Sequence, residues 1–129
     1  MKVALQYWDA RGQRAKRRFI ARQRSYHGNT LGALSLSGFL ARGSPFEGSL
    51  VDVELISAAS DYRPLDGLRG AALTDALAQE LDARIRAVGT EHVAACALSR
   101  SLGPWREPCL RLRVTQEPFA LCLTNTTSF

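Results

Sequence analysis

The sequence predicts an α/β fold, and three observations support this. Short apolar stretches typical of strands occur at Phe19–Arg22, Val51–Ile56 and Val93–Leu98. Between the second and third stretches lies a long segment with the apolar spacing of an amphipathic helix. The chain has 129 residues, which suits one small domain and is too short for two ordinary ones. We therefore expect a mostly parallel sheet with helices packed against it.

The first elements of the chain are predicted to be a helix and a strand. Val3–Asp9 has apolar residues three positions apart, as on one face of a helix, and Arg11-Gly12 follows as a stop signal. Phe19–Arg22 alternates apolar with basic residues, which indicates a short strand.

A second helix, Leu31–Leu36, is expected next. Asn29 or Thr30 could cap its amino end, and Gly38 would end it. The segment Gly43–Gly48 then has the composition of a loop.

The strongest helical pattern lies in the second half of the chain. A turn-rich segment, Ser57–Gly70, precedes it, Thr74 is the expected cap, and Gly89 is the expected stop. The apolar residues recur at helical spacing: Leu77, Leu81, Ile85 and Val88. Val93–Leu98 then has the composition of a buried strand.

Most of the net charge of +5 comes from one short window. The basic residues in it are Arg11, Arg14, Lys16, Arg17, Arg18, Arg22 and Arg24. Such a cluster can contact nucleic-acid phosphates, or it can be a solvated turn and strand edge. Only Phe19 and Tyr26 are interleaved with it, and no recognition-helix pattern follows, so we favour the solvated edge. Nucleic acid is not an expected partner.

The cysteines indicate neither a disulfide framework nor a structural zinc site. There are three of them, an odd number, and no Cys-x-x-Cys pair. His92 and Cys96 are four residues apart, but they are only two of the four ligands that zinc needs. We expect a surface histidine and a buried thiol, and no metal site.

The chain is expected to be cytoplasmic and not membrane-bound. No apolar run approaches the roughly 20 residues that span a bilayer. The opening residues become polar too soon for a secretory signal.

The most informative motif is Ser25-Tyr26-His27-Gly28, which directly follows the first predicted strand. Loops at the carboxyl ends of strands build the ligand sites of α/β proteins, so an aromatic ring and an imidazole are expected there. Tyr26 could instead be a core tyrosine, and His27 could orient a neighbour or satisfy a loop carbonyl. Gly28 suits an unusual backbone conformation or a close approach. Ser25 and Asn29 are expected to form caps or turns.

The segment SYHGNTLGALSLSG resembles the signature loop and helix of class III (ω-type) aminotransferases. The resemblance runs from about Val3 to Ala95 and implies that residues 1–95 are part of a fold type I large domain. It implies pyridoxal 5′-phosphate as cofactor, with Tyr26, His27 and Gly28 binding it and Tyr26 lying against the pyridine ring. It also implies amino transfer between an amine or amino acid and a keto acid, in a homodimeric parent protein.

The chain lacks the amine that this chemistry needs. Transamination requires a lysine that forms a Schiff base and moves a proton. The only lysines are Lys2 and Lys16, and neither matches the family's catalytic context. We therefore expect no catalytic residue and no activity from this chain alone. The alternative is a small basic α/β module that binds nucleic acid or an acidic partner.

Residues 96–129 depart from the family and are interpreted as an out-of-frame tail. The family's strand delivers Ala-Glu-Pro-Val, whereas this chain has Ala97-Leu98-Ser99-Arg100. Permissible codons for these residues and the following Ser101 regenerate Ala-Glu-Pro-Val in the neighbouring frame. We therefore expect a frameshift near Ala95–Ala97, from a pseudogene or a sequencing error.

Overall fold

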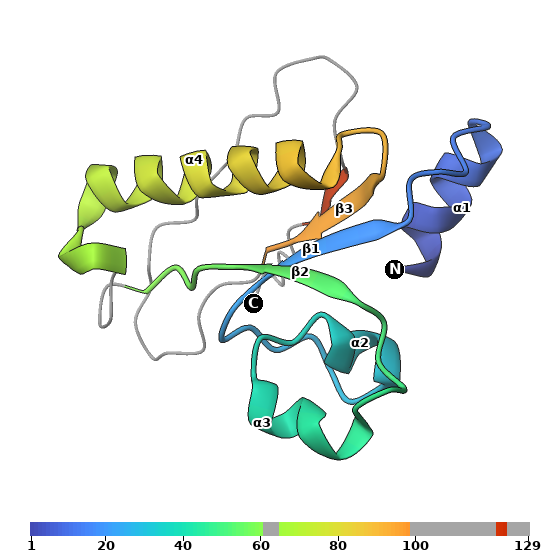
Figure 1. Cartoon of the computed structure of the whole chain (residues 1–129), viewed down its shortest axis with the longest axis horizontal. Coiled ribbons are helices and arrows are strands. Elements are labelled where there is room, and N and C mark those ends of the chain that lie inside the picture. The colour runs from blue at the N-terminus through green and yellow to red at the C-terminus, as the bar shows by residue number, and fades with distance from the viewer. Residues whose placement is uncertain (61–64, 99–120, 124–129) are drawn as a thin grey trace, which may run out of the picture.

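A parallel β-sheet organises the chain (Figure 1). The structure is a computed structural model that describes residues 1–60, 65–98 and 121–123. Its strands are β1 (Arg18–Arg22), β2 (Val53–Ile56), β3 (Val93–Ala97) and β4 (Leu121–Leu123). Their order is β2-β1-β3-β4, and every neighbouring pair is parallel. The predicted α/β fold is confirmed.

Helices lie on both faces of this sheet (Figure 1). They are α1 (Lys2–Ala10), α2 (Leu31–Ser35), α3 (Leu40–Gly43) and α4 (Gly70–Val88). Two 3₁₀ turns, Ser44–Phe46 and Leu65–Gly67, stand in the connections. Among the described residues, no helix is both long enough and apolar enough to cross a membrane.

Alternate residues of β1 are buried on opposite faces of the sheet. Phe19 and Ala21 pack with Trp8 of α1 on one face. Ile20 packs on the other face with Leu81 of α4. Because Ile20 is fully buried, its removal from water contributes about 1.5–3 kcal/mol to folding.

Two side chains attach the first part of the chain to β3 and to the turn before it: Trp8 of α1, and Lys16, which follows that helix. The Nε1–H of Trp8 donates to the carbonyl of Ala94 at 2.7 Å. The Nζ of Lys16 donates to the carbonyl of Thr90 at 2.6 Å and lies 4.6 Å from the Trp8 ring centroid. Burial lowers the pKa of the Lys16 ammonium, and the charge of Glu91 opposes this shift.

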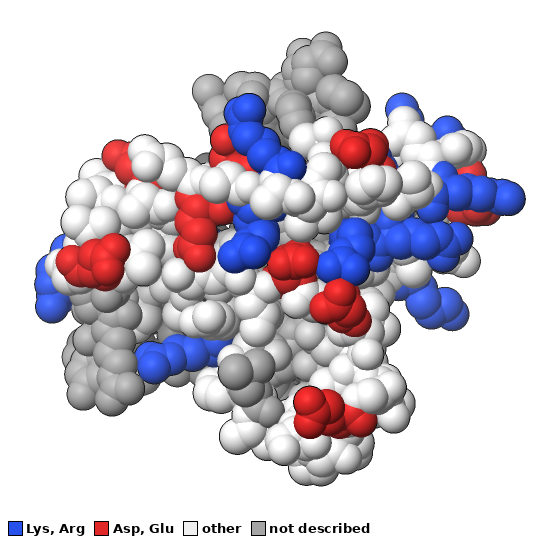
Figure 2. All heavy atoms as spheres, viewed as in Figure 1, with Lys and Arg blue, Asp and Glu red and all other residues white. Residues whose placement is uncertain are grey.

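The basic window is not a uniformly solvated edge, so that expectation was partly wrong. Lys16 and Arg22 are buried, and Lys16 is held by the Thr90 carbonyl and the Trp8 ring. Arg18 binds Asp52 at 2.8 Å and Glu54 at 2.9 Å. Figure 2 shows blue Lys and Arg side chains interspersed with red acidic ones in this region. Most of the window is therefore engaged within the fold.

Helix α4 begins one turn earlier than predicted. Its first residue is Gly70, and the N-cap residue Arg69 makes no side-chain cap. Thr74 lies inside the helix, where its Oγ1 donates to the Gly70 carbonyl at 3.2 Å. Gly89 ends the helix with φ 90°, as predicted.

Two other segments differ from expectation. The predicted loop Gly43–Gly48 contains the last residue of α3 and a 3₁₀ turn. The strand β4 lies in the tail, for which no strand was predicted, and it pairs with β3, with Cys122 opposite Cys96.

Candidate functional site

The segment after β1 forms a closed loop at the carboxyl end of the sheet. Gly38 returns to make a parallel bridge with Gln23. A Cβ on Gly38 would lie 2.3 Å from the Gln23 Cα and 2.4 Å from the Arg24 nitrogen. Only glycine allows this crossing. The sequence indicated Gly38 as a helix stop but carried no signal of the contact.

Two serines fasten the loop from inside. The Oγ of Ser25 donates to the Arg22 carbonyl at 2.6 Å, and Ser25 is 1% exposed. The Oγ of Ser37 donates to the Ser25 carbonyl at 2.8 Å. These bonds satisfy backbone carbonyls that the strand ladder leaves free. Ser25 is thus a turn former, as predicted.

The start of α2 fixes the other side of the loop. The backbone N–H of Ala33 donates to Thr30 Oγ1 at 3.2 Å, so Thr30 is the cap of the two candidates. Asn29 instead accepts a hydrogen bond from Tyr26 Oη at 3.0 Å.

Tyr26 is a surface residue and not a core tyrosine, since 39% of it is exposed. The guanidinium of Arg42 lies over its ring, with Cζ 5.5 Å from the centroid. No pattern in the sequence indicates this contact, which joins residues from two separate segments.

His27 and Gly28 follow Tyr26 in the loop. The Nε2 of His27 is buried and has no hydrogen-bond partner in the part of the chain that the structure describes. Burial lowers the pKa of His27, so the neutral imidazole is favoured at pH 7. Gly28 has φ +121°, a conformation that other residues rarely adopt, and this explains the glycine.

The described part of the chain also contains a hollow of about 360 Å³ between α2, α3 and β2. Its lining is largely apolar, with Leu34, Phe39 and Val53 among its residues. The predicted residues Tyr26, His27 and Gly28 do not line it. The candidate site is therefore the exposed loop and not this hollow.

Neither lysine belongs to the loop. Lys2 is in α1, and Lys16 precedes the amino end of β1, where its Nζ is bound to the Thr90 carbonyl. The five residues of β1 separate this end from the loop by roughly 16 Å at the rise of a strand.

A pyridoxal phosphate fits these residues only in part. The half-exposed ring of Tyr26 suits stacking, and the unpartnered His27 Nε2 can bond a ligand. No amine at the loop can bind the cofactor covalently, so no covalent step is assigned to this chain.

The described residues hold no group of three or more metal ligands. His92 is half exposed on its side chain, and Cys96 is buried in β3, as predicted for both.

Fold and loop together define an α/β protein segment with an exposed loop at the carboxyl end of a parallel strand. Comparison with known proteins identifies its relatives. No family model matches the chain. An aminotransferase of Gibberella zeae is 44% identical over 108 residues, which is 80% of this chain and 21% of that protein. An uncharacterized aminotransferase of Bacillus subtilis is 39% identical over 103 residues, 80% of this chain and 23% of the relative.

Solved structures give the same result. An amine transaminase from an uncultivated Pseudomonas species, solved in its pyridoxal-phosphate-bound form, superposes with a TM-score of 0.71 and 29% identity. The match covers 76% of this chain and 22% of that one. The ω-transaminase of Pseudomonas jessenii gives a TM-score of 0.68 and 33% identity, over 74% of this chain and 21% of the other.

The chain is therefore related to the aminotransferases and spans about a fifth of the length of these curated relatives. The comparisons confirm the predicted resemblance to a fragment of a class III, pyridoxal-phosphate-dependent aminotransferase. They do not favour the alternative of a small basic interaction module.

Proposed function

We propose that this chain supplies the ring-binding loop of a pyridoxal-phosphate-dependent aminotransferase, and that Tyr26 is the surface on which the cofactor ring lies. The exposure of Tyr26 at the carboxyl end of β1 carries this proposal. Bound pyridoxal phosphate supplies an electron sink for negative charge at the substrate Cα. Tyr26 contributes ring stacking and shields the ring from water.

His27 and Gly28 complete the loop in this proposal. The neutral His27 offers its buried Nε2 to a polar atom of the ligand, because this nitrogen has no hydrogen-bond partner among the described residues. Gly28, with its positive φ, lets the backbone turn directly after His27. Both residues orient the ligand and neither takes part in covalent chemistry.

The chain alone does not transfer amino groups in this proposal, because the sequence has no lysine besides Lys2 and Lys16. The amino donor, the keto acid and the homodimer belong to the intact parent protein. A coupled assay with an amino donor and a keto acid should give no turnover above background. Measurable turnover by the pure chain would contradict this.

Ring binding can be tested with pyridoxine, which has neither an aldehyde nor a phosphate. NMR titration of the ¹⁵N-labelled chain should give saturable shifts of the Tyr26 and Gly28 amides. Tyr26→Ala should weaken binding about two- to tenfold, in line with the loss of an aromatic pair. Tyr7→Ala is the matched control, because Tyr7 is also 39% exposed but lies on α1. Equal binding by the wild type and Tyr26→Ala would refute the role of Tyr26.

We further propose that residues 1–95 are the aminotransferase segment and that residues 96–129 are out of frame. The change in character after Ala95 and the re-reading of Ala97–Arg100 support this. Resequencing the gene from upstream of Met1 to beyond Phe129 tests it. Codons that do not regenerate Ala-Glu-Pro in the neighbouring frame would refute the frameshift.

A further inference from the structure

Two arginines at the candidate site have no acidic partner among the described residues. Arg24 and Arg42 are exposed, and neither forms an ion pair or a side-chain hydrogen bond with another residue that the structure describes. Other arginines of the described chain lie within 3.4 Å of a carboxylate: Arg14, Arg18, Arg84 and Arg86. Arg24 and Arg42 thus lie beside the loop without an ion pair among the described residues, as Arg11 and Arg17 do on the α1 side.

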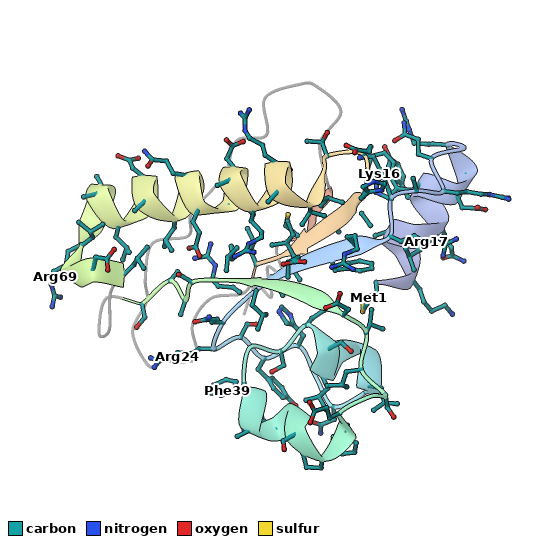
Figure 3. The ribbon with its side chains drawn as sticks, viewed as in Figure 1. Met1, Lys16, Arg17, Arg24, Phe39 and Arg69 are labelled. Carbon is teal, nitrogen blue, oxygen red and sulfur yellow. The ribbon has the colours of Figure 1, made fainter. Side chains whose placement is uncertain are left out.

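The crossing at Gly38 brings these arginines to one edge. The backbone of Gly38 contacts Gln23 and Arg24, so the segment that leads from Phe39 to Arg42 starts against Arg24. Figure 3 shows Arg24 and Phe39 at the same end of the sheet. Arg24 also has φ +57°, an unusual conformation for a residue with a side chain.

Two aromatic rings hold the Arg42 guanidinium. Its Cζ is 5.5 Å from the Tyr26 ring centroid and 5.4 Å from the Phe39 ring centroid. Stacking of this kind restrains a guanidinium and uses its face, while the N–H groups at its edge stay available. Those groups match the two oxygens of a carboxylate or phosphate.

We propose that Arg42, held by Tyr26 and Phe39, binds the oxyanion of a small-molecule ligand, either a carboxylate or a phosphate. Arg24 adds positive charge at the same edge. This rests on the proposed function, because it assigns an anion-binding residue to the ligand whose ring lies on Tyr26. In this proposal the Arg42 guanidinium lies on one face of the Tyr26 ring, and the ring of the ligand lies on the other face.

The test is an NMR titration of the ¹⁵N-labelled full chain with sodium phosphate and, separately, with sodium acetate, at constant ionic strength. We expect saturable shifts of the Tyr26, Phe39 and Arg42 amides with at least one of these anions. Arg42→Gln should weaken binding at least about tenfold, because a bidentate charge-assisted contact is lost. Arg42→Lys keeps the charge without the planar fork and should give a smaller loss.

Arg11 provides a matched control. Its Cζ lies 5.4 Å from the ring centroid of Tyr7, so it is also a stacked surface arginine, but on the α1 side. Arg11→Gln should leave anion binding unchanged. Three results would overturn the proposal. They are an equal loss of anion affinity in Arg11→Gln, the absence of saturable shifts in the wild type, and wild-type amide shifts in the random-coil range. If Arg42→Gln fails to fold, the anion affinity of Arg42→Lys serves as the test. Wild-type affinity in Arg42→Lys would contradict the bidentate contact.

Pyridoxine separates this inference from the proposed function. Pyridoxine binding without binding of phosphate or acetate refutes the role of Arg42 and leaves the ring site intact. Binding of phosphate or acetate without pyridoxine supports Arg42 and refutes ring stacking on Tyr26. Saturation by phosphate alone or by acetate alone assigns the site to that anion.

Discussion

Glu80 of α4 accepts hydrogen bonds from both the backbone N–H and the Oγ of Ser57, at the carboxyl end of β2. Its Oε1 is 3.0 Å from the Ser57 nitrogen and 3.0 Å from Ser57 Oγ, and its Oε2 is 3.1 Å from the nitrogen. One carboxylate thus fixes the point at which β2 leaves the sheet. Because Gln23 donates to the Ile56 carbonyl at 2.8 Å, this point adjoins the start of the candidate loop.

We expect Glu80→Ala to lower the free energy of unfolding by about 1–3 kcal/mol, because two donors of half-buried Ser57 lose their acceptor. Urea unfolding followed by circular dichroism measures this. Asp82→Ala is the control on the same helix, since the exposed Asp82–Arg86 pair should be worth only about 0.3–0.5 kcal/mol. Equal decreases in the free energy of unfolding of the two variants would show that Glu80 contributes no more than an exposed carboxylate such as Asp82.

Gly38→Ala should be among the most destabilising single substitutions in the chain. Its Cβ would lie 2.3–2.6 Å from backbone atoms, which cannot move as a side chain would. We expect a loss of about 3 kcal/mol in urea unfolding, the upper part of the range for overpacking. Gly32→Ala is the control: its Cβ would meet the Met1 Sδ at an ordinary 3.5 Å, and alanine favours α2 by about 0.5–1 kcal/mol. A neutral Gly38→Ala would disprove the close crossing.

His27 should make the fold sensitive to acid. Burial lowers its folded-state pKa below the ordinary value of 6.5, so above that pH both states are neutral. As the pH falls through 6.5, the unfolded chain binds the proton first, and the free energy of unfolding decreases until the folded pKa is reached. His27→Gln should reduce the loss of stability between pH 7.5 and pH 5.5, measured by urea midpoints. His92→Gln, at an exposed histidine, is the control and should lose as much stability over this pH range as the wild type. The same loss of stability in His27→Gln as in the wild type would contradict the prediction.

Trp8→Phe should loosen α1 from the sheet. The substitution leaves the buried carbonyl of Ala94 without its donor, which costs about 1–3 kcal/mol, and removes the indole that faces Lys16. Native-state hydrogen exchange should show faster exchange in β3 as well as a lower urea midpoint. Tyr7→Phe, next to it on the exposed side, should change neither quantity by more than about 0.5 kcal/mol. Unchanged exchange in Trp8→Phe would mean that the indole bond does not hold the helix.

Local patterns predicted the elements and the position of the candidate loop. The alternation in Phe19–Arg22, the spacing of Leu77 and Leu81, and the stop at Gly89 each depend on neighbours in sequence, and the structure agrees with them. The loop Tyr26–Gly28 follows β1 as expected, although its ligand is still a proposal.

The missed features depend on residues distant in sequence. The burial of Lys16 needs the carbonyl of Thr90, 74 residues away. The stack of Arg42 on Tyr26 and the crossing of Gly38 over Gln23 arise only once the loop has closed. The early start of α4 has a different cause: Arg69 and Gly70 begin the helix without a side-chain cap, so the usual start signal is absent.

The hydrogen bond from Trp8 to Ala94 joins residues 86 positions apart, and this has a kinetic consequence. Helix α1 packs against Phe19 of β1 and against Ala94 and Ala95 of β3. Its complete packing surface therefore forms only after β3 has been synthesised and has paired with β1, and until then we expect α1 to be exposed to solvent. Contacts of such long sequence separation slow folding, because the entropy of closing the chain is lost before the contact forms. We therefore expect docking of the first helix to be a late event, with the pairing of β1 and β3 as the step that permits it.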